Sequence, residues 1–230
     1  DSVMGPRSWR FSEKTPDTEI KAHHLYELYI YSNKRYTGRV TIPVLWDMQS
    51  RTIVNNNSSD ILDMFETEFN QFSEKSHYSF YSENYQFEEK RLDRFISKRI
   101  NDGIYRCLLS ENDSEKKIAE RNFKRALAKL NALLEDRNYL VDTVPTVPDW
   151  KLFVTLIRFE LVYSELFFEK TISLDAFNNI QVYLKRLFQL DQISSTINFY
   201  EMVKGYYRTL GKKENKTKII NYIDKINEEN

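Results

Sequence analysis

The spacing of apolar and polar residues changes along the first third of the chain, and each change predicts a different element. Residues 18–33 carry apolar side chains at helical spacing, whereas residues 39–46 (RVTIPVLW) are rich in β-branched residues and indicate a strand with a proline inside it. A turn-like segment leads to a second short strand at 51–54, and helical spacing returns at 59–69. The pattern therefore predicts a compact α/β arrangement.

From residue 87 onward the spacing is helical almost throughout. The polar, aromatic and aperiodic residues 70–86 separate this part from the first, so we expect a domain boundary there. The helices that the pattern predicts span residues 87–110, 115–136, 147–167, 173–189 and 194–209. A Lys-, Glu- and Asn-rich segment follows to the end, and we interpret its basic cluster as a solvated tail: Lys212, Lys213, Lys216 and Lys218.

The clearest helix start lies at Thr146–Asp149. Thr146 is placed as the N-cap, Asp149 follows three residues later, and an apolar run begins at Trp150. This is a capping box in which Asp replaces the usual Glu.

The composition agrees with a mostly helical globular protein. Only five Gly and five Pro occur in 230 residues, which favours long regular elements. Lys plus Arg and Asp plus Glu are equal, at 34 each, so no net charge attracts nucleic acid or an anionic membrane. No apolar run reaches the roughly 20 residues that cross a bilayer.

Residues suited to metal or thiol chemistry are scarce. His23 and His24 point to different faces of a predicted helix, and with only His77 and one cysteine besides, no zinc site is expected. Cys107 lies in an apolar helical stretch and is interpreted as a buried structural thiol. A single cysteine also excludes an internal disulfide and favours a reducing compartment.

Two short segments have both a ligand-binding and a purely structural interpretation. A cis peptide at Ile42–Pro43 would turn the Ile42 backbone outward to pair with an extended peptide ligand, but an edge-strand proline explains the residue equally well. Asn57 and Ser58 precede a predicted helix whose free N–H groups suit a carboxylate, with ordinary capping as the alternative.

Four stretches in order over nearly the whole chain carry a family resemblance. They are GRVTIPVLWDMQSRTIVNNNSSDIL at 38–62, NDGIYRC at 101–107, TLIRFELVY at 155–163 and the Tyr-Tyr-Arg run at 206–208. They resemble segments of the omega-like and Xi-class glutathione transferases, the glutathionyl-hydroquinone reductases, and the composition is similar to the fungal omega-class branch. Thr146–Asp149 matches the capping box of glutathione transferase C-terminal domains.

The resemblance implies an α/β plus all-α protein: a partial thioredoxin-like, glutathione-binding domain over residues 1–80 and an all-helical domain over residues 81–230. In the first domain, Trp9 would line the glutathione site, and Asn57 and Ser58 would bind the γ-glutamyl end. The loop that would hold the cysteinyl part consists of Arg39, Val40, Thr41, Ile42 and Pro43.

In the helical domain, the resemblance implies three catalytic tyrosines and no metal. Tyr105 would donate or accept a proton on the aromatic substrate. Tyr163 and Tyr206 would face the same pocket and help keep the catalytic thiol ionised, because a phenol that donates a hydrogen bond to a thiolate favours the charged form.

The sequence departs from the family in several places. The Cys-Pro-Trp-Ala motif that carries the family's nucleophile has no counterpart here and would have to precede Asp1, and Cys107 aligns elsewhere, beyond Tyr105. Asn57 stands where the family usually has Glu, which would weaken glutathione binding by about 1–3 kcal/mol. The segments after Tyr163 and after Arg208 also differ, which bears on hydroquinone specificity more than on the fold.

The resemblance implies a glutathione-dependent thiol transferase or reductase with deglutathionylation, dehydroascorbate reductase or glutathionyl-hydroquinone reductase activity. Its expected partners are glutathione and a small glutathionylated or quinone-type substrate, without nucleic acid or membrane, and the family tends to form homodimers. We expect a cytoplasmic protein, with an organelle such as the peroxisome left open. Two alternatives stand beside this reading: a non-catalytic scaffold of the same fold, and an unrelated helical binding domain.

Overall fold

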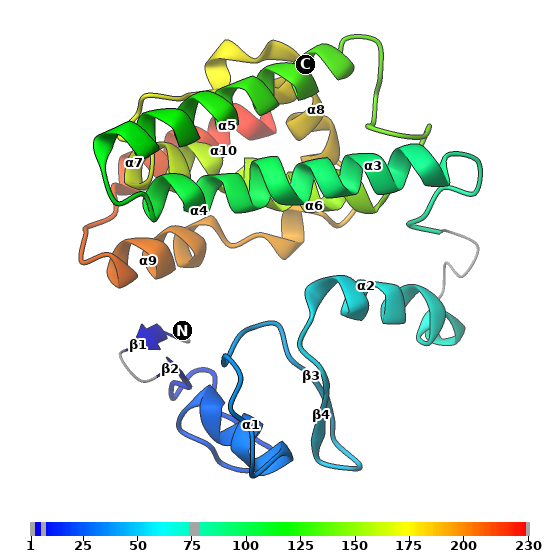
Figure 1. Cartoon of the computed structure of the whole chain (residues 1–230), viewed down its shortest axis with the longest axis vertical. Coiled ribbons are helices and arrows are strands. Elements are labelled where there is room, and N and C mark those ends of the chain that lie inside the picture. Colours follow the sequence, from blue (N-terminus) through cyan, green and yellow to red (C-terminus); the bar gives the residue numbers. More distant parts are fainter. Residues whose placement is uncertain (1–2, 6–7, 74–78, 229–230) are drawn as a thin grey trace. The chain divides into compact units, whose positions relative to one another are not determined.

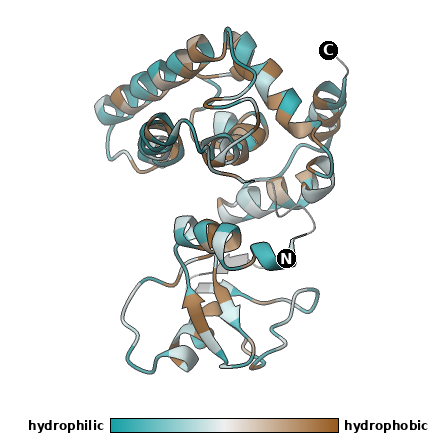
Figure 2. Cartoon of the chain, turned by 90° about the vertical axis from the view of Figure 1, so that its right-hand side faces the viewer, coloured by the Kyte–Doolittle hydropathy of each residue, from teal (hydrophilic) through white to brown (hydrophobic). Residues whose placement is uncertain are grey.

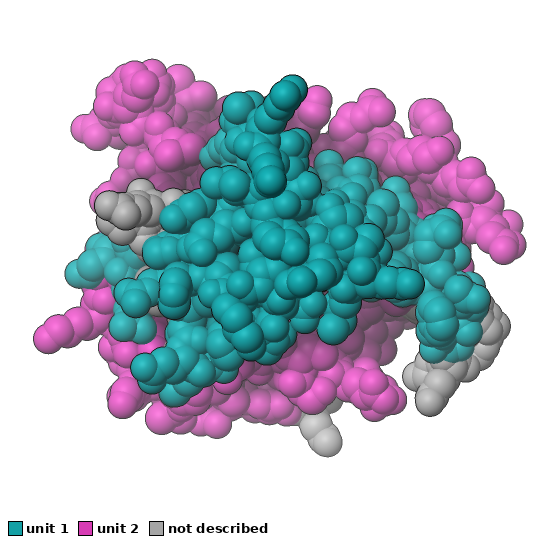
Figure 3. Space-filling model, turned by 90° about the horizontal axis from the view of Figure 1, so that it is seen from below, with its two compact units in different colours: residues 1–78, 208–211 teal, residues 79–207, 212–230 magenta. Residues whose placement is uncertain are grey.

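The computed structural model describes residues 3–5, 8–73 and 79–228, and the chain divides into two compact units (Figure 1 and Figure 3). The first unit comprises Asp1–Tyr78 with Arg208–Gly211, and the second comprises Ser79–Tyr207 with Lys212–Asn230. Within the expected boundary segment 70–86, the described residues form only the 3₁₀ turn Asn70–Phe72 before the next helix begins at Gln86.

The first unit combines short strands with two helices. Its elements are β1 (Val3–Gly5), β2 (Ser8–Arg10), α1 (Leu25–Ser32), β3 (Leu45–Asp47), β4 (Thr52–Asn55) and α2 (Ser58–Thr67). β1 pairs with β2 and β3 with β4, both antiparallel. The buried apolar core of this unit is small, and its members are Ala22, Leu25, Leu28 and Tyr29.

The helix predicted over residues 18–33 is wrong in its first half, because α1 begins only at Leu25. The Asp17 carboxylate accepts hydrogen bonds from the backbone N–H groups of three following residues, Glu19, Ile20 and Ala22, and so holds them in a loop. His24 is the N-cap of α1, so the two adjacent histidines lie before the helix and not on its faces.

The strand predicted over residues 39–46 is also mostly wrong, because only Leu45 and Trp46 join β3. Residues 39–44 form no strand, and two carbonyl groups in this segment bind tyrosine hydroxyls in place of a neighbouring strand. The predicted strand at 51–54 and helix at 59–69 are confirmed as β4 and α2, with ends shifted by one or two residues.

The second unit is helical in all its described elements. They are α3 (Gln86–Ile96), the π-helical turn Ser97–Asn101, α4 (Asp102–Leu108), α5 (Asp113–Leu133), α6 (Val147–Arg158), the π-helical turn Phe159–Tyr163, α7 (Ser164–Leu166), the 3₁₀ turn Leu174–Ala176, α8 (Asn178–Phe188), the 3₁₀ turn Ser194–Thr196, α9 (Phe199–Thr209) and α10 (Lys216–Asn227). In Figure 1, α5 runs alongside the continuous helical stretch formed by α3 and α4, and in Figure 2 the helices carry both hydrophobic and hydrophilic segments.

All five helices predicted beyond residue 87 are present, but the segment after them was misjudged. Residues 216–227 form α10, which buries Ile219 and Ile226 at i,i+7 spacing against the helical core. Lys218, one of the residues assigned to a solvated tail, donates a hydrogen bond to Glu165 at 2.9 Å. The basic cluster therefore belongs in part to the folded unit.

The capping box at Thr146–Asp149 is confirmed, and it is buried. Asp149 has no exposed surface and accepts hydrogen bonds from the backbone of Leu140, the backbone and hydroxyl of Thr146, and the hydroxyl of Tyr183. Four donors on one carboxylate fix the start of α6, the central helix of this unit.

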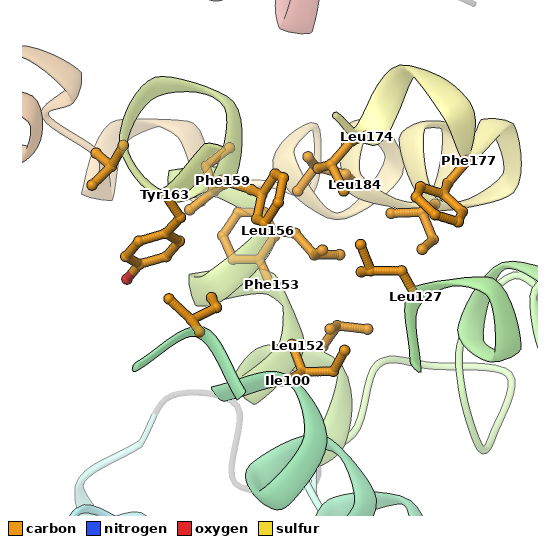
Figure 4. Packing of buried hydrophobic residues seen from close by; sticks show 14 of the residues in the cluster. Ile100, Leu127, Leu152, Phe153, Leu156, Phe159, Tyr163, Leu174, Phe177 and Leu184 are labelled. Carbon is orange, nitrogen blue, oxygen red and sulfur yellow. The ribbon is translucent and has the colours of Figure 1, made fainter. Parts of the chain in front are cut away.

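A single large apolar cluster fills the second unit, and Figure 4 shows part of it. Side chains from α5, α6 and α8 meet there, among them Leu127, Leu156 and Leu184. No helix within the described ranges combines the length and apolar character that crossing a membrane requires.

Candidate functional site

Three tyrosines from distant parts of the sequence meet in the second unit. Tyr105 lies on α4, Tyr163 ends the second π-helical turn, and Tyr206 lies on α9. The hydroxyls of Tyr163 and Tyr206 are 3.0 Å apart, and their rings meet edge to face at 5.6 Å. The Tyr105 hydroxyl hydrogen-bonds with both of them. Figure 4 shows Tyr163 at the edge of the apolar cluster, with its hydroxyl directed away from the other labelled side chains.

Phe167 is the residue of this cluster that sequence reasoning missed. Its ring centroid lies 5.9 Å from that of Tyr105, 5.2 Å from that of Tyr163 and 6.4 Å from that of Tyr206. It follows Tyr163 by four residues, and this i,i+4 spacing on one helical face was the available signal. Phe167 is buried, so it provides an apolar ring that contacts the rings of all three tyrosines.

The surroundings keep the phenols of Tyr105 and Tyr163 protonated. Burial is the main cause that raises the pKa of Tyr105 to about 12, and it also raises the pKa of Tyr163 strongly. The neighbouring Tyr206 raises both pKa values further, while the charge of Arg158 opposes the shift in each. At neutral pH, Tyr105 and Tyr163 are therefore hydrogen-bond donors, and Tyr105 is 44% exposed, which leaves it open to a substrate.

The helix that carries Tyr206 is anchored next to this residue. Tyr207 is buried, and its hydroxyl bonds with Glu165, which also accepts the hydrogen bond from Lys218 on α10. Burial raises the pKa of Tyr207 to about 12, whereas Lys218 lowers that of Glu165. Glu165 stays ionised and holds α9 and α10 to the segment that contains Tyr163.

In the first unit, the loop of residues 39–43 is shaped by side chains from α1 and the turn after it. The Ile42–Pro43 peptide is cis, which is one of the two interpretations that the sequence left open, and Ile42 is 54% exposed. Val40 packs against the small core of this unit, as does Trp9 on β2, so both residues lie around the same apolar cluster. The structure therefore places Trp9 and the loop in one unit, as the resemblance requires.

Asn57 has the capping role that was the structural alternative for this residue. Its side-chain oxygen accepts hydrogen bonds from the backbone N–H groups of Ser59 and Asp60, and Ser58 is the first residue of α2. Asn57 and Ser58 are both exposed at this helix start. The residue before them, Asn56, donates to the Thr41 hydroxyl at 3.3 Å, which ties the helix start to the loop.

Cys107 is a buried thiol, as predicted. Burial raises its pKa to about 12, so the reactive thiolate is hardly populated at neutral pH. Over the ranges described, no group of three or more His, Cys, Asp or Glu side chains is arranged to hold a metal ion.

Comparison with known proteins connects these observations. A family model described as "Glutathione S-transferase, C-terminal domain" matches residues 89–186. The solved structure of glutathione transferase Xi 1 from Trametes versicolor is 31% identical in sequence to this chain and superposes on it with a TM-score of 0.82. The match covers 90% of this chain and 75% of the Trametes versicolor chain. This chain belongs to the Xi-class glutathione transferases.

Other relatives of this glutathione transferase agree with that assignment. Glutathionyl-hydroquinone reductase YqjG of Escherichia coli (strain K12) is 31% identical over 216 residues, which cover 90% of this chain and 66% of the relative. The glutathione-bound structure of YqjG has a TM-score of 0.85 and 30% identity over 90% of this chain and 68% of that one. This Xi-class chain thus spans about two thirds of the length of these relatives.

The family shows what kind of fold the two units represent. The helical unit is a glutathione transferase C-terminal domain, and the strands and helices of the first unit correspond to a thioredoxin-like N-terminal part. An unrelated helical binding domain, one of the two alternatives, is therefore wrong.

Proposed function

We propose that the complete protein is a glutathione-dependent thiol transferase or reductase that acts on a small glutathionylated aromatic substrate such as a glutathionyl-hydroquinone. The observation that carries this proposal is the cluster of Tyr105, Tyr163 and Tyr206, whose hydroxyls hydrogen-bond with one another and whose rings contact the ring of Phe167. Phenol groups beside aromatic rings suit a substrate that is itself a phenol and that gains charge as it reacts.

In this proposal the predicted N-terminal domain, residues 1–80, binds glutathione. Trp9 would line the glutathione site, and the loop Arg39–Pro43 would hold the cysteinyl part. Asn57 with Ser58 would bind the γ-glutamyl end at the start of α2. The free N–H groups of this helix start and its dipole favour a carboxylate. The relative whose structure contains bound glutathione supports this step.

The chemistry that we propose transfers the glutathionyl group to a thiolate. A cysteine thiolate attacks the glutathionyl sulfur and forms a mixed disulfide, while the bond from that sulfur to the aromatic carbon breaks. The aromatic group keeps the electron pair of this bond and takes up a proton from Tyr105. A glutathione thiolate then attacks the resulting mixed disulfide, which releases oxidised glutathione and restores the enzyme thiolate. The raised pKa of Tyr163 lets it donate a hydrogen bond to that thiolate throughout.

Cys107 is not the nucleophile in this scheme, because it is buried and its raised pKa keeps it protonated. We assign the attacking thiolate to a cysteine outside these 230 residues. We place the activity in the cytoplasm and expect a homodimer, as in other family members. A scaffold without catalysis is the competing function, and Asn57 in place of the family's acidic residue favours it.

The test uses the complete gene product. We would measure glutathione-dependent reduction of a small mixed disulfide and of a glutathionyl-hydroquinone, in the wild type and in Tyr105→Phe. We expect both substrates to turn over in the wild type, and hydroquinone turnover alone to fall by about tenfold or more in the variant. A folded, complete protein that turns over neither substrate would be the scaffold.

A further inference from the structure

We propose that Tyr29 is the positioning residue of the glutathione-binding loop, because its hydroxyl fixes the direction of the Ile42 N–H that would meet the cysteinyl part of glutathione. This inference rests on the proposed function and concerns how the same loop is held in shape. Tyr29 lies on α1, twelve residues before the loop carbonyl that it contacts, and only 2% of its surface is exposed.

The contact itself is short and directed. The Tyr29 hydroxyl donates a hydrogen bond to the backbone carbonyl of Thr41 at 2.6 Å. Residues 39–44 form no strand, so no ladder of backbone hydrogen bonds holds this carbonyl. The orientation of the peptide that joins Thr41 to Ile42 therefore depends on a side chain.

The geometry of the peptide bond links the direction of the Thr41 carbonyl to that of the Ile42 N–H. In a planar trans peptide the C=O of one residue and the N–H of the next point in opposite directions. With the Thr41 carbonyl turned in toward Tyr29, the Ile42 N–H is turned away from it. No group in the described part of the chain accepts a hydrogen bond from that N–H, and Ile42 is among the exposed large hydrophobic residues.

Asn56 completes the arrangement by fixing the phenol. Its side-chain amide donates to the Tyr29 hydroxyl at 3.1 Å and to the Thr41 hydroxyl at 3.3 Å. Since one oxygen of Tyr29 receives this bond, its single proton is left for the Thr41 carbonyl. Asn56 also directly precedes the Asn57 cap, so the loop and the helix start share one hydrogen-bonded network.

A second tyrosine makes the same kind of hydrogen bond to a loop carbonyl two residues earlier. The Tyr36 hydroxyl donates to the Arg39 carbonyl at 2.7 Å, and the Tyr36 and Tyr29 rings pack at 4.8 Å. Gly38 makes this approach feasible, because a Cβ at that position would lie 2.6 Å from the Tyr36 hydroxyl. The carbonyl groups of Arg39 and Thr41 are thus both hydrogen-bonded to phenols, and this orients the peptide bond that follows each of these two residues.

The experiment compares Tyr29→Phe with Tyr31→Phe in the complete protein. Tyr31 lies on the same helix, but its ring packs near Trp46 and not on the loop. Glutathione affinity is measured by isothermal titration calorimetry, kcat and the KM for glutathione by mixed-disulfide turnover, and loop order by hydrogen exchange of peptides over residues 38–45. These readouts separate positioning from general stability.

We expect Tyr29→Phe to weaken glutathione binding and raise its KM by about tenfold, with kcat at saturating glutathione changed less than about twofold. Exchange should accelerate in the loop and not in β4, and Tyr31→Phe should match the wild type. Asn56→Ala, which keeps the phenol but frees it to rotate, should weaken binding in the same direction by about threefold, and it replaces Tyr29→Phe if that variant fails to fold.

Two results would overturn the inference while the proposed function survives. One is a wild type that binds glutathione together with a folded Tyr29→Phe or Asn56→Ala that binds it equally well. The other is a variant in which exchange rises throughout the first unit and kcat falls with affinity, since that is a general structural role. A complete wild type that binds no glutathione would overturn the proposed function as well.

Discussion

The two units of this protein hold their functional groups by different means. In the first, the apolar cluster has four buried residues with partly buried ones packed around them, and the loop of residues 39–43 is held by hydrogen bonds from tyrosine and asparagine side chains. In the second, a far larger apolar cluster includes Tyr163 and contacts Tyr206, and Tyr105 joins these two through its hydroxyl and its ring contact with Phe167. A unit with a small core depends on specific polar contacts to shape its site, whereas a large core can place polar groups at its edge.

The comparison predicts that one of the two largest effects on stability lies at Asp149. Asp149→Ala leaves four donors without their buried acceptor, so we expect a loss of about 4 kcal/mol in the free energy of unfolding of the helical unit. Urea unfolding followed by circular dichroism measures it. Asp175→Ala is the matched control, because its ion pair with Lys225 is exposed and worth less than about 1 kcal/mol. A loss below 1 kcal/mol in Asp149→Ala would contradict this view of the capping box.

Leucine truncations test the difference between the two cores directly. Leu127→Ala should cost about 4 kcal/mol, because this side chain is fully buried in the large cluster, and Leu28→Ala about 2 kcal/mol, because its small cluster can collapse. Hydrogen exchange with mass spectrometry reports each unit separately. Equal costs, or a larger one at Leu28, would mean that the first unit is packed as tightly as the second.

A charge at position 57 should improve ligand binding by a smaller amount. Asn57→Asp keeps an oxygen that can cap α2 and restores an acidic group, so we expect glutathione affinity to rise by about fivefold, as measured by calorimetry. Asn57→Ala is the control: it loses the cap, at about 1 kcal/mol of stability, and adds no charge. Unchanged affinity in Asn57→Asp would show that the ammonium of glutathione lies elsewhere.

The smallest expected effect is a change of stability at high pH. The pKa of Tyr105 is 10.0 in its ordinary state and about 12 in the folded protein, so the folded state retains the proton longer than the unfolded state. The stabilisation from this group is fully present below pH 10 and is lost as the pH rises from 10 to about 12. Tyr105→Phe should therefore lose less stability than the wild type over this interval in thermal unfolding. Identical slopes would indicate that the Tyr105 phenol is not shielded from water.

The sequence predicted the helical unit well, since the apolar spacing of its helices and the capping box at Thr146–Asp149 are local signals that the structure retains. Prediction failed where distant residues decide the local structure. Nothing near Thr41 in the sequence shows that its carbonyl binds Tyr29, so the segment was predicted to be a strand. Residues 216–227 are so polar that the sequence suggested no buried face. In the structure, two isoleucines of this helix are nevertheless buried, and Lys218 forms an ion pair with Glu165.

In the candidate site, only the residues that the family resemblance named were predicted. Tyr105, Tyr163 and Tyr206 are brought together by the fold, whereas Phe167 and Tyr29 were not predicted to belong to a site. Periodicity shows which residues are buried, but it does not show which buried hydroxyl meets which carbonyl.

In the proposed function the two units have different roles: the first unit binds glutathione, and the tyrosines of the second act on the aromatic substrate. The most direct test is the pair of kinetic profiles of Tyr29→Phe and Tyr163→Phe in the complete protein with a glutathionyl-hydroquinone. The account predicts that Tyr29→Phe raises the KM for glutathione by about tenfold at nearly unchanged kcat, while Tyr163→Phe lowers kcat by about tenfold at nearly unchanged KM for glutathione. Two variants that alter the same parameter by similar factors would contradict it.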